Sequence, residues 1–142
     1  MSKNYDVEIK VLSAINSMDE GSEAENNEST YKGFLINDGE GRLALSYSEK
    51  TDGGLMTTEI HVRDTRVVVK RRGAIVSDMV FSEGRKNTSV YSIPPHSFDM
   101  TVECHSLNVQ VSDSEGRIDL LYNMEVGGDA RSARMRITWS LV

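Results

Sequence analysis

The chain has 142 residues, the size of one ordinary domain and enough to bury one substantial core. Its net charge of −6 argues against binding to nucleic acid, which relies on clustered Lys and Arg. The single cysteine, Cys104, excludes an internal disulfide and favours a reducing, cytoplasmic location. No apolar run approaches the roughly 20 residues of a membrane-spanning helix, and the opening MSKNYDVEIKVL lacks the apolar region of a signal peptide, so we expect no membrane partner.

Alternating apolar and polar residues predict β-strands along the whole chain. In chain order the expected segments are 5–11, 30–37, 42–49, 56–62, 66–72, 74–82, 87–93, 98–104, 107–111, 118–126 and 133–139. They amount to about ten short strands, separated by turns rich in Gly and Asp. The polar stretch 16–29 is expected to be a mobile loop, and no helix longer than about two turns is expected. We predict one domain over residues 1–142.

This pattern favours an all-β fold, a single up-and-down antiparallel barrel of about eight to ten strands. Short connections join neighbouring strands, and closing the sheet removes its exposed edges. A barrel of this size is either filled by side chains or holds one small ligand.

The last two strands give the clearest prediction of a hairpin, with the turn at Gly127-Gly128-Asp129. The residues expected in the core are Ile118, Leu120, Tyr122, Met124, Met135, Ile137 and Trp139.

Short motifs along the chain carry a resemblance to a known family. They are Gly33 in TYKG, Tyr47 and Glu49 in LSYSE, Arg71 and Gly73 in VKRRG, Phe81 and Gly84 in VFSEG, Tyr91, and Tyr122 in LLYNMEV. In order and spacing, over residues 5–139, these motifs resemble the YwiB-like family of small bacterial β-barrel proteins of unknown function. The resemblance implies a calycin-like barrel, similar in shape to lipocalins, and it implies no activity. The chain departs from the family where Ile93-Pro94-Pro95-His96 replaces a small polar residue and a glycine.

Motifs for catalysis, metals and nucleotides are weak. The segment 39–44, GEGRLA, fits the G-x-G-x-x-G/A motif of dinucleotide-binding proteins. That motif requires a helix after it, and here a strand is expected instead. His61, His96 and His105 lack the spacing of a zinc site. We therefore predict no enzyme activity, no cofactor and no metal.

The basic stretch of residues 66–72 contains the candidate ligand site. Arg71 shares a strand face with Val67 and Val69, so alternation directs it into the barrel. By the same rule Glu49 follows Tyr47 inward. A buried arginine needs a partner, and two alternatives are open. Arg71 forms a barrel-closing ion pair with Glu49, or it anchors the acid group of a ligand.

The predicted ligand-binding residues are Arg71, Glu49, Tyr47 and Tyr91. The leading functional hypothesis is non-enzymatic binding of a small apolar or amphipathic ligand inside the barrel. The alternative is a structural or regulatory module with a filled barrel that binds another protein of unknown identity.

Overall fold

The structure is a computed structural model that describes residues 3–17, 25–112 and 114–142. The described residues form ten antiparallel strands and the turns between them. In chain order they are β1 (Lys3–Ser17), β2 (Glu25–Asn37), β3 (Arg42–Thr51), β4 (Gly54–Arg63), β5 (Arg66–Gly73), β6 (Val76–Ser82), β7 (Lys86–Ile93), β8 (His96–Val111), β9 (Glu115–Val126) and β10 (Asp129–Leu141). Within the described ranges there is no helix that is long and apolar enough to span a membrane.

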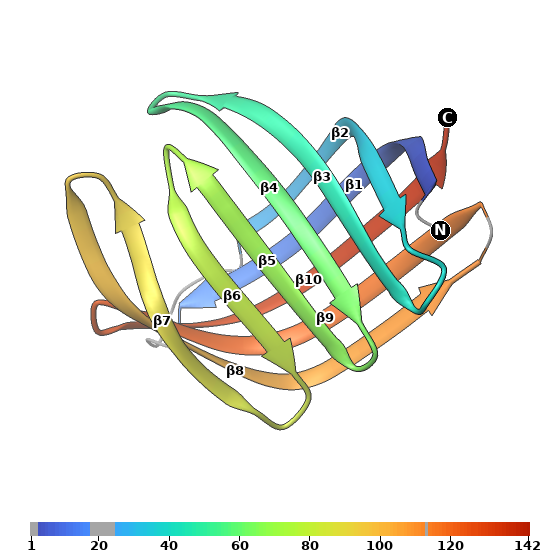
Figure 1. Cartoon of the computed structure of the whole chain (residues 1–142). Helices are drawn as coiled ribbons and strands as arrows, with labels where there is room; N and C mark the ends of the chain where they lie inside the picture. Colours follow the sequence, from blue (N-terminus) through green and yellow to red (C-terminus); the bar gives the residue numbers. More distant parts are fainter. Residues whose placement is uncertain (1–2, 18–24, 113) are drawn as a thin grey trace.

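The strands close into a barrel in which each strand pairs with its neighbours in the chain (Figure 1). Closure comes from β1, which pairs with both β2 and β10: Val7 lies opposite Gly33 on one side and Leu141 on the other. The predicted up-and-down antiparallel barrel is therefore confirmed. We call the end that carries the β3–β4, β5–β6, β7–β8 and β9–β10 turns the mouth of the barrel.

Apolar side chains at alternate strand positions fill the barrel interior. The closing hairpin has the predicted form, because Gly127-Gly128 connects the paired residues Val126 and Asp129. Its predicted core residues are buried, namely Ile118, Leu120, Tyr122, Met135, Ile137 and Trp139. Met124 is only half-buried, since it lies near the turn at the mouth.

Strand β8 corrects one prediction. The expected strands 98–104 and 107–111 form one continuous strand with a β-bulge between Cys104 and Ser106. The extra residue shifts the inward positions from even numbers, such as Cys104, to odd numbers, such as Leu107. In the sequence this shift looks like a strand boundary.

The predicted loop of residues 16–29 is also too long. Strand β1 continues to Ser17 and β2 begins at Glu25, with Ile15 paired to Glu25. Polar residues are tolerated on both faces there because this end of β2 is open to solvent at the mouth, where Asn26, Asn27 and Glu28 are exposed. Residues 18–24 lie outside the described residues.

Strands β6 and β7 are joined in part by side chains. Their backbone register holds only at Val76↔Ser92 and Ser77↔Tyr91. Beyond these pairs, Ser89 Oγ donates a hydrogen bond to the Asp78 carbonyl oxygen at 2.8 Å. This contact takes the place of missing ladder bonds at the seam between β6 and β7.

Candidate functional site

A continuous row of residues crosses the inner face near the mouth. The strand register places Tyr47 opposite Thr58, Thr58 opposite Arg71, Arg71 opposite Ser77, and Ser77 opposite Tyr91. We call these five residues the inner row. The adjacent row, farther from the mouth, is apolar and buried, and consists of Leu45, Ile60, Val69 and Met79. The inner row is therefore where the apolar core gives way to polar side chains.

Arg71 points into the barrel, as alternation predicts. It shares its strand face with Val67 and Val69, which are buried, and is itself half-buried. Its charge reaches Tyr122 on β9: burial raises the pKa of Tyr122, and the Arg71 charge partly lowers it again. The Arg71 side chain therefore lies on the inner face of the barrel.

Glu49 also faces inward and is half-buried, one row nearer the mouth, where it pairs with Met56. Among the ion pairs formed by the described residues, none joins Glu49 to Arg71. The expected barrel-closing ion pair is therefore wrong. Strand β4 separates the two residues, and they occupy different rows of the barrel. Neither Arg71 nor Glu49 forms an ion pair with another described residue.

Two hydroxyl groups flank Arg71 within the inner row. Thr58 is 1% exposed and Ser77 is 2% exposed, and they are the direct cross-strand neighbours of Arg71. Within the described part of the chain, neither Thr58 Oγ1 nor Ser77 Oγ has a hydrogen-bond partner. Thr58 Oγ1 lies beside the Tyr47 phenol without reaching hydrogen-bond geometry. Leaving a buried hydroxyl unsatisfied costs about 1–3 kcal/mol.

Aromatic rings line the wall beside these groups. Tyr31 and Tyr47 stack with ring centroids 4.2 Å apart and an interplanar angle of 13°. Burial raises the pKa of Tyr31, and the interaction with the Glu49 carboxylate raises it further. For Tyr47, burial raises the pKa, the Arg71 charge lowers it, and the Glu49 charge raises it. The predicted site residue Tyr91 is half-buried at the end of the inner row.

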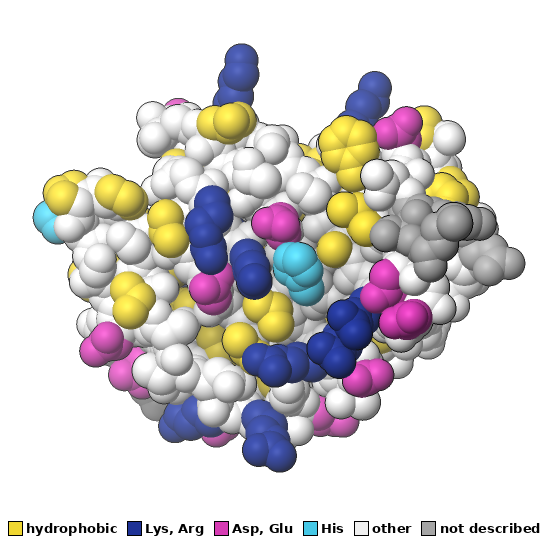
Figure 2. Space-filling model, in the orientation of Figure 1, with side chains coloured by type: hydrophobic (Ala, Val, Ile, Leu, Met, Phe, Trp, Pro, Cys, Tyr) yellow, Lys and Arg dark blue, Asp and Glu magenta, His cyan; other side chains and the backbone are white. Residues whose placement is uncertain are grey.

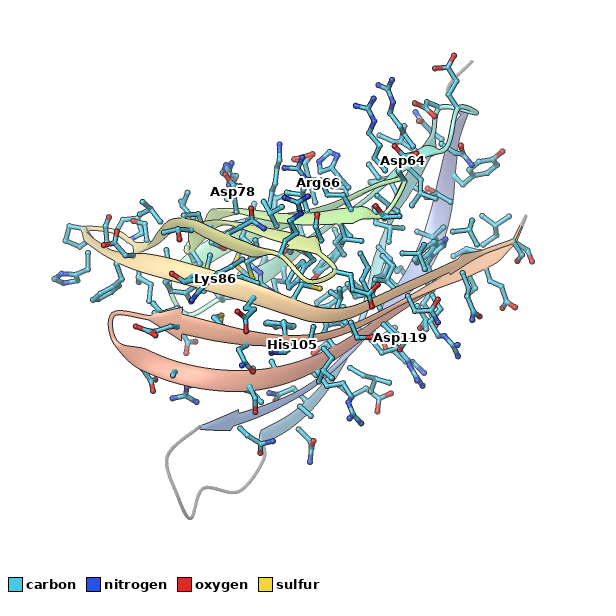
Figure 3. All side chains as sticks on the ribbon, turned by 90° about the horizontal axis from the view of Figure 1, so that it is seen from below. Asp64, Arg66, Asp78, Lys86, His105 and Asp119 are labelled. Carbon is cyan, nitrogen blue, oxygen red and sulfur yellow. The ribbon has the colours of Figure 1, made fainter. Side chains whose placement is uncertain are left out.

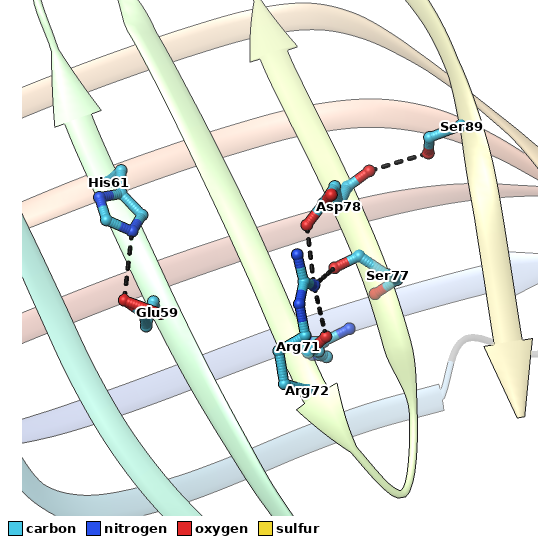
Figure 4. A network of polar contacts seen from close by, with 7 residues as sticks. All are labelled: Glu59, His61, Arg71, Arg72, Ser77, Asp78 and Ser89. Atoms are coloured by element: carbon cyan, nitrogen blue, oxygen red, sulfur yellow. Dashed lines mark hydrogen bonds and ion pairs between the residues drawn. The ribbon is translucent and has the colours of Figure 1, made fainter. Parts of the chain in front are cut away.

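Arg72 holds the backbone of the site from the outer face (Figure 4). Its Nη1 donates hydrogen bonds to the carbonyl oxygens of Arg71 at 2.7 Å and Ser77 at 3.3 Å. The same nitrogen lies 2.9 Å from Asp78 Oδ1. These contacts fix β5 to β6 at the position where Arg71 and Ser77 face each other inside.

The remaining basic residues of this region belong to the outer surface. The outer register of β4, β5 and β6 reads Glu59, Lys70 and Asp78, so charges of opposite sign alternate there. Figure 2 shows Lys and Arg side chains interspersed with Asp and Glu on this face. Figure 3 shows Asp64, Arg66 and Asp78 directed away from the barrel.

Four surface hollows on the described part of the chain lie away from the inner row, and none of these four is lined by Arg71, Glu49, Tyr47 or Tyr91. The apolar cluster occupies the barrel below the inner row. A ligand at Arg71 would therefore sit at the mouth, above a filled core.

Sequence reasoning missed several residues of this site: Tyr31, Thr58, Ser77 and Tyr122. A signal for two of them was present. Thr58 interrupts the apolar face formed by Met56 and Ile60, and Ser77 lies on the face of Met79. A polar residue on an apolar strand face marks a polar group directed into the core. The contact of Tyr31 with Tyr47 depends on strand register, which the sequence does not reveal.

The fold and the site define a closed ten-stranded up-and-down β-barrel protein with an arginine and a glutamate facing its mouth. A family model described as "Domain of unknown function (DUF1934)" matches residues 9–138. The chain belongs to this family, which confirms the resemblance seen in the sequence.

Two comparisons connect the chain to one bacterial relative. It is 27% identical over 88 residues to the "Uncharacterized beta-barrel protein YwiB" of Bacillus subtilis (strain 168). That alignment covers 62% of this chain and 62% of the relative's length. The crystal structure of ywiB protein from Bacillus subtilis is similar with a TM-score of 0.86 and 24% sequence identity, covering 98% of this chain and 93% of that one. The structural similarity shows a shared fold.

Proposed function

We propose that the protein is a non-enzymatic binding module for a small amphipathic molecule, whose acidic group pairs with Arg71 at the mouth of the barrel. The observation that carries the proposal is the pair of buried, unpartnered hydroxyls of Thr58 and Ser77 on either side of Arg71. An acid group accepts two hydrogen bonds from a guanidinium and further ones from hydroxyls. Such a ligand would pair with the Arg71 charge and give hydrogen-bond partners to the two hydroxyls.

The shape of the site limits the ligand. The row below Arg71 is packed with buried apolar residues, so the apolar part of the ligand must lie toward the mouth. Tyr91 and its cross-strand neighbour Phe98 provide aromatic surface there, and Phe98 is 42% exposed. Burying this surface against an apolar group would add to the affinity.

The first test of this proposal measures binding of anilinonaphthalene sulfonate, an acidic amphipathic probe, by fluorescence titration. Arg71→Met should weaken binding about tenfold or more, because a charge-assisted, two-point contact is lost. Arg66→Met, which removes an outward arginine from the same strand, should leave binding unchanged. An Arg71→Met variant that folds and binds as the wild type would eliminate the site.

The hydroxyls allow a second test that separates binding from stability. Thr58→Val and Ser77→Ala remove buried unsatisfied groups, so the free energy of unfolding should stay level or rise. Probe affinity should fall in both variants. A structural role for the hydroxyls predicts the reverse, a loss of stability with unchanged affinity.

A second candidate function is a protein-interaction module with a filled barrel. The packed core favours it, and so do Phe34 and Ile36, outward residues of β2 that are 57% and 43% exposed. Native mass spectrometry of protein purified from its own cells distinguishes the two candidates. A bound small molecule supports the ligand proposal, and a bound protein supports the interaction module.

A further inference from the structure

The mouth holds a second charge besides Arg71, the Glu49 carboxylate, which interacts with the Tyr31 phenol but forms no ion pair among the described residues. Glu49 is half-buried on the inner face. Residues 18–24, which join β1 to β2, contain no Lys or Arg. A half-buried carboxylate without a cation is costly, and a positively charged group of a ligand would offset that cost.

Both charges act on Tyr47, which shares a strand with Glu49 and a row with Arg71. The pKa of Tyr47 responds to both, with burial as the largest effect, so both side chains approach the same phenol. Strands β3 and β5 are two spacings apart, about 10 Å, and both side chains extend toward the interior. A molecule that carries both charges would bridge these two groups across β4.

The wall at Glu49 suits an ammonium group. The stacked rings of Tyr31 and Tyr47 lie beside the carboxylate, and aromatic rings and phenol oxygens both attract cations. Strands β2 and β3 pair only from Gly33↔Tyr47 to Asn37↔Leu43, so the ladder ends before Tyr31 and Glu49.

We infer that the ligand is a compact zwitterion of the amino-acid type, with its carboxylate at Arg71 and its ammonium group at Glu49. This inference rests on the proposed function, since it uses the same anchor, and it adds the charge class of the ligand. The unpartnered Thr58 and Ser77 hydroxyls complete the carboxylate site, and Phe98 offers aromatic surface to the side chain.

The test compares three probes that share one apolar body: phenylalanine, hydrocinnamate, which lacks the amine, and phenethylamine, which lacks the carboxylate. Leucine, isocaproate and isoamylamine form a second set. Titration calorimetry on the wild type should show the amino acid of at least one set binding about tenfold or more tighter than its acid. The amine of that set should bind most weakly, because it cannot use Arg71.

Two variants assign the charges. Glu49→Gln should bring amino-acid affinity down to that of the acid and leave acid affinity unchanged, whereas Arg71→Met should weaken both. The matched control is Glu59→Gln, an outward carboxylate on β4, which should change nothing. If Glu49→Gln fails to fold by circular dichroism, Tyr31→Phe should reduce the preference for the amino acid in the same direction.

The outcomes separate the inference from the proposed function. Acids that bind as tightly as the amino acids, or a preference that survives Glu49→Gln, would overturn the zwitterion assignment. The proposed function stands in that case if Arg71→Met still abolishes acid binding. A wild type that binds none of the six probes overturns the zwitterion inference, and the fluorescence titration then decides the proposed function separately.

Discussion

Gly116 and Trp139 show how strongly one pair of residues controls the packing of this barrel. They face each other across β9 and β10, and Trp139 is 3% exposed. A Cβ atom added to Gly116 would overlap the Trp139 ring at Cζ2. The indole therefore occupies the space that any other side chain at position 116 would need.

The first stability prediction follows from this contact. Trp139→Ala should lower the free energy of unfolding by about 3–5 kcal/mol, as large core truncations do. Gly116→Ala should lower it by about 1–3 kcal/mol through overpacking. Because removal of the indole leaves room for the new methyl group, the double variant should be clearly less destabilised than the sum of the two. Chemical denaturation measures all three, and strict additivity would contradict the contact.

For single residues, the sequence predicts which face of a strand a side chain lies on better than it predicts which residues that side chain contacts. Alternation alone places Arg71 inward, because Val67 and Val69 lie on its face. It does not reveal that Thr58 and Ser77 flank Arg71, since that depends on the register of three strands. The expected ion pair between Arg71 and Glu49 was wrong for the same reason, because two residues that both face the interior need not lie in the same row of the barrel.

The bounds of a strand could be predicted where apolar and polar residues alternate without a break. They were ambiguous where a β-bulge interrupts the alternation. Strands β3, β4 and β5 agree closely with the expected segments, because turns rich in Gly or Asp bound them. In β8 the bulge at Cys104/Ser106 divides one strand into two apparent segments. The strand ends of β1 and β2 were missed because both faces of β2 are polar there, so that no alternation marks the strand.

The β6–β7 seam gives a prediction about dynamics. Only two residue pairs of these strands are in register, whereas β8 and β9 pair along most of their length. The backbone groups of Asp78 and Val80 point toward β7, whereas those of Glu103 and Asn123 face each other across β8 and β9. Amide hydrogens of Asp78 and Val80 should therefore exchange faster than those of Glu103 and Asn123, because they lack ladder partners. Hydrogen exchange read by NMR checks the order.

A matched pair of variants on β7 refines that prediction. Ser89→Ala removes the hydrogen bond to the Asp78 carbonyl and should accelerate exchange along β6 further. Thr88→Ala changes an exposed neighbour on the same strand and should leave β6 as it was. Equal exchange along the β6–β7 and β8–β9 seams would contradict the idea of a weak seam.

Across the whole molecule, closure of the barrel brings tyrosines from three strands into one interior region. Tyr31, Tyr47 and Tyr122 come from β2, β3 and β9, and burial is the largest cause that raises the pKa of each above the ordinary value of 10.0. A raised tyrosine pKa means that the folded protein keeps a proton that the unfolded chain releases. The stability contributed by these neutral phenols is fully present below about pH 10 and is lost as the pH rises further.

The free energy of unfolding should therefore decline above about pH 10, with each protected tyrosine contributing at most about 1.4 kcal/mol per pH unit. The double variant Tyr47→Phe/Tyr122→Phe should show a shallower decline, since phenylalanine releases no proton in either state. Denaturant titrations at neutral and alkaline pH measure the difference between the two slopes, and tyrosinate absorbance shows which phenols ionise before unfolding. Parallel slopes for the wild type and the double variant would mean that these two phenols ionise as readily in the barrel as in the unfolded chain, so that Arg71 and solvent at the mouth, rather than burial, control their titration.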